Sequence, residues 1–142
     1  MKKPSFPPAP TISANGFQKR HARKPAKNEH CLQRSLVNWC HGQGNGIVQR
    51  RFFAVPNGGA RNIIQAARLK AEGVRPGAPD LVFYGPAGSV LWLELKNGTA
   101  GKLSEAQATM HEDLYHCGHR VVVARTLANA IEAVVSFYRS KV

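Results

Sequence analysis

The chain has 142 residues and carries 20 Lys and Arg against 8 Asp and Glu, a net charge of +12. This length corresponds to one domain with a single core, and the charge favours a polyanionic partner, nucleic acid first, over a ribosome-like or merely soluble basic protein. The three cysteines lack CxxC spacing, which argues against a zinc ribbon and a disulfide framework and favours reduced thiols in a cytosolic compartment. No apolar run approaches 18 residues, which argues against a membrane span.

Residues 1–28 differ in composition from the rest of the chain. They contain seven of the 20 Lys and Arg and five of the nine prolines, with no Asp or Glu and no apolar periodicity. We expect a disordered or loosely held basic arm, which either contacts phosphates or only keeps the chain soluble. No apolar segment follows Lys2 and Lys3, so we expect no secretory signal. The folded domain is expected over residues 29–142.

Residues Glu29 to Cys40 are predicted to form a helix, because apolar side chains recur at helical spacing: Leu32, Leu36, Trp39 and Cys40. Glu29 lies near the middle of this stripe. A carboxylate on an apolar face is costly unless it meets a cation or hydrogen-bond donors, so Glu29 is a candidate metal ligand. The alternative is an acid at the helix N-terminus that the helix dipole stabilises.

A strand is expected from Ile47 to Val55, followed by a glycine-containing loop. The adjacent Gly58 and Gly59 would let the backbone approach a ligand closely. With Asn57 and Arg61, they form a candidate contact to a nucleic-acid backbone; the alternative is a plain turn. A second helix is predicted from Asn62 to Glu72. Its inward side chains are expected to be Ile63, Ala66, Ala67 and Leu69, with Gly73 ending the helix.

The two runs Leu81–Tyr84 and Val90–Lys96 flank the Gly/Pro-rich turn Gly85–Ser89, which predicts a β-hairpin. If Tyr84 pairs with Val90, Asp80 faces Glu94 across the hairpin, and Lys96 joins the same face. Opposed carboxylates repel each other, so this register favours a cation between them. Alternatively, Asp80 is an ordinary strand-entry residue, and Glu94 and Lys96 form a solvated edge.

The remainder of the chain alternates helix, strand and helix. Ser104 and Gln107 fit a capping box at the start of a helix that ends at Gly118. A short buried strand is expected over residues 120–124, and Thr126 caps a last helix. One cysteine and three histidines lie around the end of the helix that stops at Gly118, and their spacing matches no closed four-ligand zinc pattern. We therefore expect surface or helix-end roles for them: His111, His116, Cys117 and His119. The element order predicts an α/β fold with a mixed sheet of about four strands and helices on both faces.

Several of these motifs together resemble a known family. Pro79-Asp80 followed by Glu94-Leu95-Lys96 resembles the PD-(D/E)xK nuclease signature. The surrounding stretches narrow the resemblance to the VRR-NUC (virus-type replication-repair nuclease) family: Glu29 with Gln33 and Leu36, Val55–Gly59, Leu69–Gly77, Leu103–Gln107 and Gly118–Val121. The signature is weak alone, but the ordered set is specific. It runs from about Glu29 to Ala124 and implies a restriction-endonuclease-like core.

The resemblance implies a phage or bacterial DNA endonuclease that uses Mg²⁺ or Mn²⁺. The carboxylates of Asp80 and Glu94 and the carbonyl of Leu95 would hold the ion, with help from Glu29. Lys96 would orient water or offset charge at phosphorus. Two further roles are implied: Gln107 near the active site, and nucleic-acid contacts by Asn57, Gly58, Gly59, Arg61 and Lys102.

Related proteins act on branched or flapped DNA in replication, repair or recombination, and stand-alone members pair as homodimers. The alternative functions are a non-catalytic basic DNA-binding module and an RNA-binding accessory protein. No aromatic-rich signature supports RNA binding.

Overall fold

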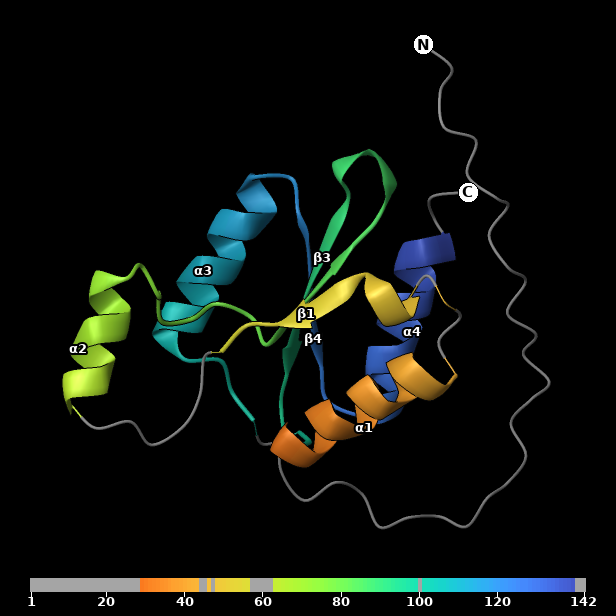
Figure 1. Cartoon of the computed structure of the whole chain (residues 1–142), viewed down its shortest axis with the longest axis horizontal. Coiled ribbons are helices and arrows are strands. Elements are labelled where there is room, and N and C mark those ends of the chain that lie inside the picture. Colours follow the sequence, from red (N-terminus) through yellow and green to blue (C-terminus); the bar gives the residue numbers. More distant parts are fainter. Residues whose placement is uncertain (1–28, 44–45, 47, 57–62, 100, 140–142) are drawn as a thin grey trace.

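The structure is a computed structural model that describes residues 29–43, 46, 48–56, 63–99 and 101–139 (Figure 1). The predicted basic arm, residues 1–28, therefore lies outside the described residues. So do four of the predicted nucleic-acid contacts: Asn57, Gly58, Gly59 and Arg61.

A four-stranded mixed sheet forms the centre of the molecule. Its strands are β1 (Phe52–Ala54), β2 (Leu81–Tyr84), β3 (Val90–Leu95) and β4 (Arg120–Ala124), in the spatial order β1-β2-β3-β4. The first three strands pair antiparallel, whereas β4 runs parallel to β3. A parallel neighbour requires a crossover connection, which the helix between β3 and β4 supplies.

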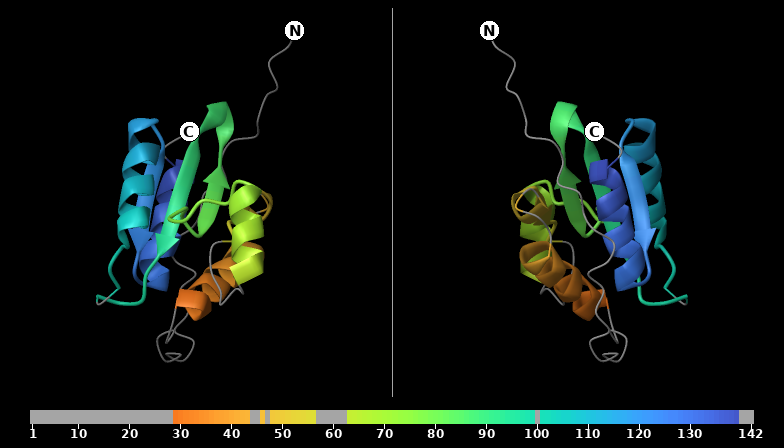
Figure 2. Two further views of the ribbon diagram at one scale, coloured as in Figure 1. Left: turned by 90° about the vertical axis from the view of Figure 1, so that its left-hand side faces the viewer. Right: turned by 90° about the vertical axis from the view of Figure 1, so that its right-hand side faces the viewer.

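Helices cover both faces of the sheet, which confirms the predicted fold class. Helices α1 (Glu29–Gly42) and α4 (Leu127–Arg139) pack together on one face, and α3 (Glu105–His116) lies on the other (Figures 1 and 2). The alternation along β3 divides its side chains between these two layers. Leu91, Leu93 and Leu95 join the α1/α4 core, so Trp92 and Glu94 point to the opposite face, which α3 covers.

The start of α4 and the end of α3 agree with the sequence patterns. The Thr126 hydroxyl accepts from the backbone N–H of Asn129 at 3.1 Å and so caps α4, as predicted. Gly118 follows α3 with a positive φ of 81°, a conformation that glycine adopts without strain.

None of the helices in the described part of the chain is long and apolar enough to cross a bilayer.

Two strand predictions need correction. Only Phe52–Ala54 of the expected Ile47–Val55 strand pairs with β2, because residues Val48–Arg50 turn into a short 3₁₀ helix. The last strand, β4, was expected to be buried, but its exposed Arg120 and half-buried central valines reflect its position at the edge of the sheet.

Helix α2 (Ile63–Ala71) forms where it was predicted, but its expected inward face is wrong. No residue of α2 is buried, and Ile63 and Ile64 are 88% and 80% exposed. Figure 1 shows α2 standing beside the sheet rather than on it. The apolar spacing correctly predicted a helix, but it does not determine whether another element covers the apolar side chains.

Candidate active site

The hairpin formed by β2 and β3 has the predicted register. Tyr84 pairs with Val90 and Val82 with Trp92, and Gly85 N–H donates to the Ser89 carbonyl at 2.8 Å across the turn. The last pair of the ladder, Leu81 with Leu93, places Asp80 opposite Glu94 one step further along. Asp80 Oδ2 accepts the backbone N–H of Leu95 at 2.7 Å, which fixes the Asp80 carboxylate beside β3.

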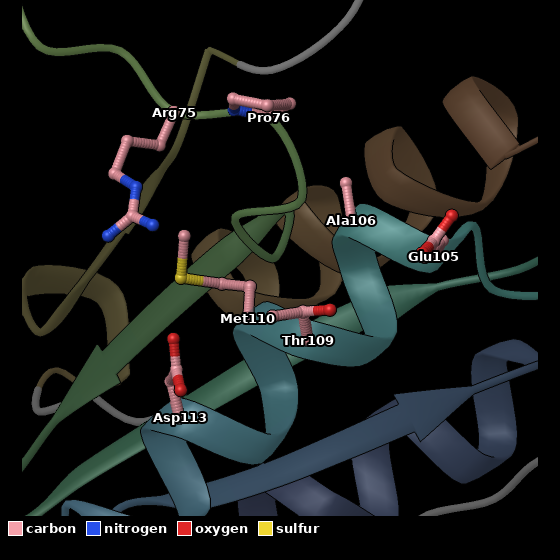
Figure 3. Close-up of a pocket in the computed structure, with 7 residues that line it drawn as sticks. All are labelled: Arg75, Pro76, Glu105, Ala106, Thr109, Met110 and Asp113. Carbon is pink, nitrogen blue, oxygen red and sulfur yellow. The ribbon is translucent and has the colours of Figure 1, made fainter.

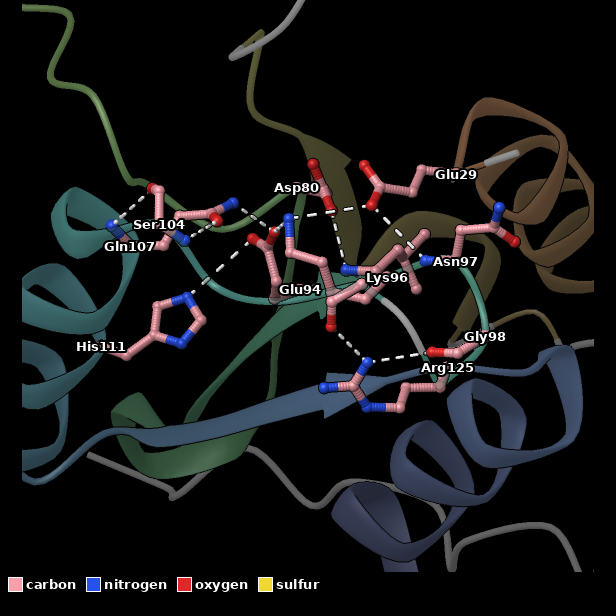
Figure 4. A network of polar contacts seen from close by, with 12 residues as sticks. Glu29, Asp80, Glu94, Lys96, Asn97, Gly98, Ser104, Gln107, His111 and Arg125 are labelled. Atoms are coloured by element: carbon pink, nitrogen blue, oxygen red, sulfur yellow. Dashed lines mark hydrogen bonds and ion pairs between the residues drawn. The ribbon is translucent and has the colours of Figure 1, made fainter.

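Glu94 is a buried carboxylate, only 1% exposed, at the centre of a polar network (Figure 4). Its Oε1 accepts from Gln107 Nε2 at 2.5 Å and lies 3.0 Å from the Lys96 ammonium. Its Oε2 has no hydrogen-bond partner among the described residues. Burial, and then the charge of Asp80, raise the pKa of Glu94 to about 7, although Lys96 opposes both effects.

Glu29 shares the Lys96 ammonium with Glu94, and the charge of Lys96 also acts on Asp80. Lys96 Nζ lies 3.8 Å from Glu29 Oε1, and that oxygen also accepts the backbone N–H of Asn97 at 3.4 Å. The first turn of α1 thus brings Glu29 to the site, where its side chain stays about half exposed. Burial raises the pKa of Asp80, while the Leu95 N–H and Lys96 act in the opposite direction. Three acids around one lysine are an excess of negative charge.

Gln107 performs its predicted capping role and also contacts the site. The Ser104 hydroxyl accepts from Gln107 N–H at 3.2 Å, and Gln107 Oε1 accepts from Ser104 N–H at 3.0 Å, which completes the capping box. The remaining amide group, Nε2, donates to Glu94. The same side chain therefore caps the start of α3 and holds a buried carboxylate.

The prediction for His111 is wrong. It lies buried on α3, with Nε2 3.9 Å from Glu94 Oε2 and without a hydrogen-bond partner among the described residues. Burial, and then the positive charge of Lys96, lower its pKa. A usable signal was present in the sequence: His111 follows Gln107 by four residues, so the two share one helix face.

Arg125 has a structural role at the site that the sequence patterns did not reveal. Its guanidinium donates to the carbonyls of Gly98 and Gly101, at 2.9 and 2.5 Å, and so ties down the loop after β3 (Figure 4). A Cβ at Gly101 would lie 3.1 Å from Cβ of Lys96, so this loop packs closely on the lysine. Lys102 follows on the same loop and is exposed, as a contact to a nucleic acid requires.

The segment that leads into Asp80 packs against the first turn of α3. Gly77 has a φ of 88°, and a Cβ there would collide with the carbonyl oxygen of Ala106. Beside this contact lies a cavity of about 330 Å³ lined by Arg75, Pro76, Glu105, Ala106, Thr109, Met110 and Asp113 (Figure 3). The cavity includes none of the predicted site residues.

The donor set suits a hard divalent cation with few protein ligands. No group of three or more His, Cys, Asp or Glu side chains that could hold a metal ion occurs in the described ranges. Two carboxylates and a carbonyl could nevertheless hold Mg²⁺, which keeps several waters and uses one or two carboxylates together with substrate phosphates. The buried Glu94 Oε2, which has no hydrogen-bond partner among the described residues, fits a cation ligand beside Asp80.

The profile of the VRR-NUC domain matches residues 13–127 of the chain. A solved structure described as "VRR_NUC domain protein" superposes with a TM-score of 0.65 at 24% sequence identity, over 79% of this chain and 88% of that chain. A second, described as "VRR_NUC domain", gives a TM-score of 0.50 at 21% identity, over 75% of this chain and 92% of that chain. No curated protein matches the chain. At these identities the two solved structures show a shared fold.

Proposed function

Because the chain belongs to the VRR-NUC domain family, whose members are nuclease-type domains, we propose that it is a metal-dependent endonuclease that hydrolyses phosphodiester bonds in DNA. The observation that carries the proposal is the placement of Asp80 opposite Glu94, with the Lys96 ammonium 3.0 Å from Glu94. Selectivity for branched or flapped DNA, in replication, repair or recombination, rests on the family resemblance alone.

Asp80, Glu94 and the carbonyl of Leu95 are the proposed ligands of Mg²⁺ or Mn²⁺, and Glu29 would assist through water. When bound, such an ion polarises the scissile phosphate and lowers the pKa of a coordinated water. Asp80 keeps its position through the Leu95 N–H, and Glu94 through Gln107. The protein thereby orients both carboxylates before any ligand binds, which spares the cost of ordering them during the reaction.

Lys96 is the proposed electrostatic catalyst. Hydrolysis joins a water oxygen to phosphorus and breaks one P–O ester bond; the water loses a proton and the leaving oxygen gains one. Negative charge grows on the phosphoryl oxygens, and an ammonium fixed nearby stabilises that charge. The contacts of Lys96 with Glu94 and Glu29 hold it in position for this role.

The charge of the molecule supports DNA as the substrate. A net charge of +12 attracts a polyanion over long distances. The exposed Lys102 beside the site is a proposed phosphate contact, as are Asn57, Gly58, Gly59 and Arg61. A homodimer in the cytoplasm is proposed on the resemblance alone, and light scattering of the purified protein would measure its mass.

The test compares cleavage of end-labelled duplex, single-stranded, flapped and four-way-junction DNA with and without Mg²⁺. We expect cleavage only with the metal, and we expect Asp80→Asn and Glu94→Gln to abolish it while DNA binding persists. Glu112→Gln is the matched control, because Glu112 is an exposed acid on α3. Wild-type rates in either site variant would refute the metal site. Binding without cleavage by the wild-type protein would instead identify a non-catalytic DNA-binding module.

A further inference from the structure

Two buried polar atoms in this molecule face each other without hydrogen bonds. Glu94 Oε2 and His111 Nε2 both lack a partner among the described residues, and they are 3.9 Å apart. That separation is too long for a hydrogen bond, which requires about 2.7–3.2 Å. Leaving a buried donor or acceptor unpaired is costly, so two such atoms that face each other at 3.9 Å indicate a contact that forms in another state of the site.

Helix α3 presents two donors to one carboxylate. Gln107 and His111 are four residues apart and therefore lie one above the other on the same helix face. Gln107 Nε2 already binds Glu94 Oε1, and His111 Nε2 faces Glu94 Oε2. Because the capping box fixes Gln107 at the first turn of α3, His111 lies one turn further along the same face and points toward Glu94.

A count of lone pairs shows what each oxygen of Glu94 can accept. A carboxylate oxygen has about two acceptor positions. Oε1 uses both, for Gln107 and for the Lys96 ammonium. Oε2 has two left, enough for one N–H donor and one cation. A shift of about 1 Å would bring His111 into hydrogen-bond distance and leave the other position open to the ion.

We propose that His111 is a positioning residue for Glu94, whose Oε2 accepts a hydrogen bond from His111 Nε2–H when the site holds its metal. Helix α3 then holds both oxygens of the carboxylate and fixes its plane toward Asp80. The inference rests on the proposed function in one respect, that Glu94 is a metal ligand. Partners of this kind orient metal ligands, and losing one costs about 10- to 100-fold in metal affinity or activity.

Two charged groups face His111. Glu94 lies across from it on β3. Burial, and then the positive charge of the Lys96 ammonium, lower the pKa of the ring. A neutral imidazole carries one N–H, and the geometry assigns that hydrogen to Nε2, the atom that faces the carboxylate.

The first test measures Mn²⁺ binding to the full chain by calorimetry, without DNA. We expect His111→Leu to weaken binding about 10- to 100-fold, and His111→Gln to restore most of it, because its amide can donate from a similar position. His116→Leu is the matched control, since His116 is an exposed histidine on the same helix, and it should bind like the wild type.

Metal-free His111→Leu should unfold at an unchanged or higher temperature, because it removes an unpaired buried nitrogen. If His111 had only a structural role, replacing it would lower the unfolding temperature.

The outcomes separate this inference from the proposed function. If Glu94→Gln loses Mn²⁺ binding but His111→Leu does not, only the role of His111 is refuted. If Glu94→Gln binds like the wild type, or the wild type does not bind, the metal site itself is refuted. A second readout needs no variant: ¹⁵N NMR of the wild-type imidazole in Mg²⁺ should show the hydrogen of His111 on Nε2. A hydrogen on Nδ1 would overturn the inference.

Discussion

Lys96 lies within ion-pairing distance of two carboxylates while its own side chain is largely buried. If it stabilises charge in the transition state, Lys96→Ala should lower the single-turnover cleavage rate by on the order of 10²-fold or more. DNA affinity should change little, because Lys96 is one of 20 basic residues.

Lys102→Ala is the matched comparison, because Lys102 is exposed on the adjoining loop. It should leave the rate at saturating DNA unchanged and reduce the salt dependence of binding by about one unit. Equal losses of rate and affinity in Lys96→Ala would make Lys96 an ordinary phosphate contact.

The raised pKa of Glu94 has a consequence for the stability of the metal-free protein. Between its ordinary value of 4.5 and about 7, the folded state binds more protons at Glu94 than the unfolded chain does. The free energy of unfolding therefore falls as pH rises through this window. Glu94→Gln removes the effect. The free energy of unfolding of this variant should therefore rise relative to that of the wild type, by on the order of 2–3 kcal/mol between about pH 5 and pH 8.

Urea denaturation in chelator at several pH values measures that difference. His111 is present in both proteins. Because its pKa is lowered, its own contribution makes the free energy of unfolding rise with pH below the ordinary histidine pKa of 6.5. Glu132→Gln, at an exposed acid on α4, should show a difference that is independent of pH. A flat difference for Glu94→Gln as well would mean that Glu94 titrates normally.

Among the elements, the contact between the segment before β2 and α3 determines where Asp80 and Gln107 lie relative to each other. Gly77→Ala adds a Cβ that collides with the backbone of Ala106 and also strains a φ of 88°. Gly73→Ala is a matched control, because Gly73 has a φ of 91° but open space around the added Cβ.

Both glycine variants should lose about 1–2 kcal/mol of stability from backbone strain. Gly77→Ala should lose a further ~1–3 kcal/mol from overpacking and bind Mn²⁺ more weakly, because Asp80 is displaced. Urea denaturation and calorimetry measure the two effects. Equal losses of stability in both variants would show that the segment before β2 moves to accommodate the added Cβ without an energetic cost from the contact with Ala106.

At the scale of the whole molecule, the charge is unevenly distributed along the chain. Residues 1–28 hold seven of the 20 Lys and Arg and none of the proposed metal ligands. Deleting them should weaken DNA binding and flatten its salt dependence. Each phosphate contact contributes about −0.9 to the slope of log affinity against log salt, so three or four contacts would reduce the slope by about three.

A salt titration in Ca²⁺, which limits cleavage, measures the slope, and single-turnover rates in Mg²⁺ should remain at saturating DNA. An unchanged slope would reduce residues 1–28 to a solubilising segment. A lost rate with an intact fold would mean that they help to build the site.

The features that the sequence determined by itself are local ones. The hairpin follows from two strand patterns around one turn, and once Tyr84 pairs with Val90 the period of two places Asp80 opposite Glu94. The capping box of Ser104 and Gln107 spans four residues and formed as predicted. In both cases the interacting groups are joined by a short, conformationally restricted stretch of chain.

The tertiary structure alone decided the features that depend on contacts between distant segments. Glu29 meets Asn97 across 68 positions of sequence, and Arg125 holds a loop that precedes it by 24 to 27 positions. Periodicity marked α2 as a helix, yet only packing shows that nothing in the described chain buries it. The sequence places His111 on the same helix face as Gln107, but only the packing of α3 on β3 brings it to Glu94. A residue pattern encodes a backbone conformation, but burial and pKa depend on which other segments lie against it.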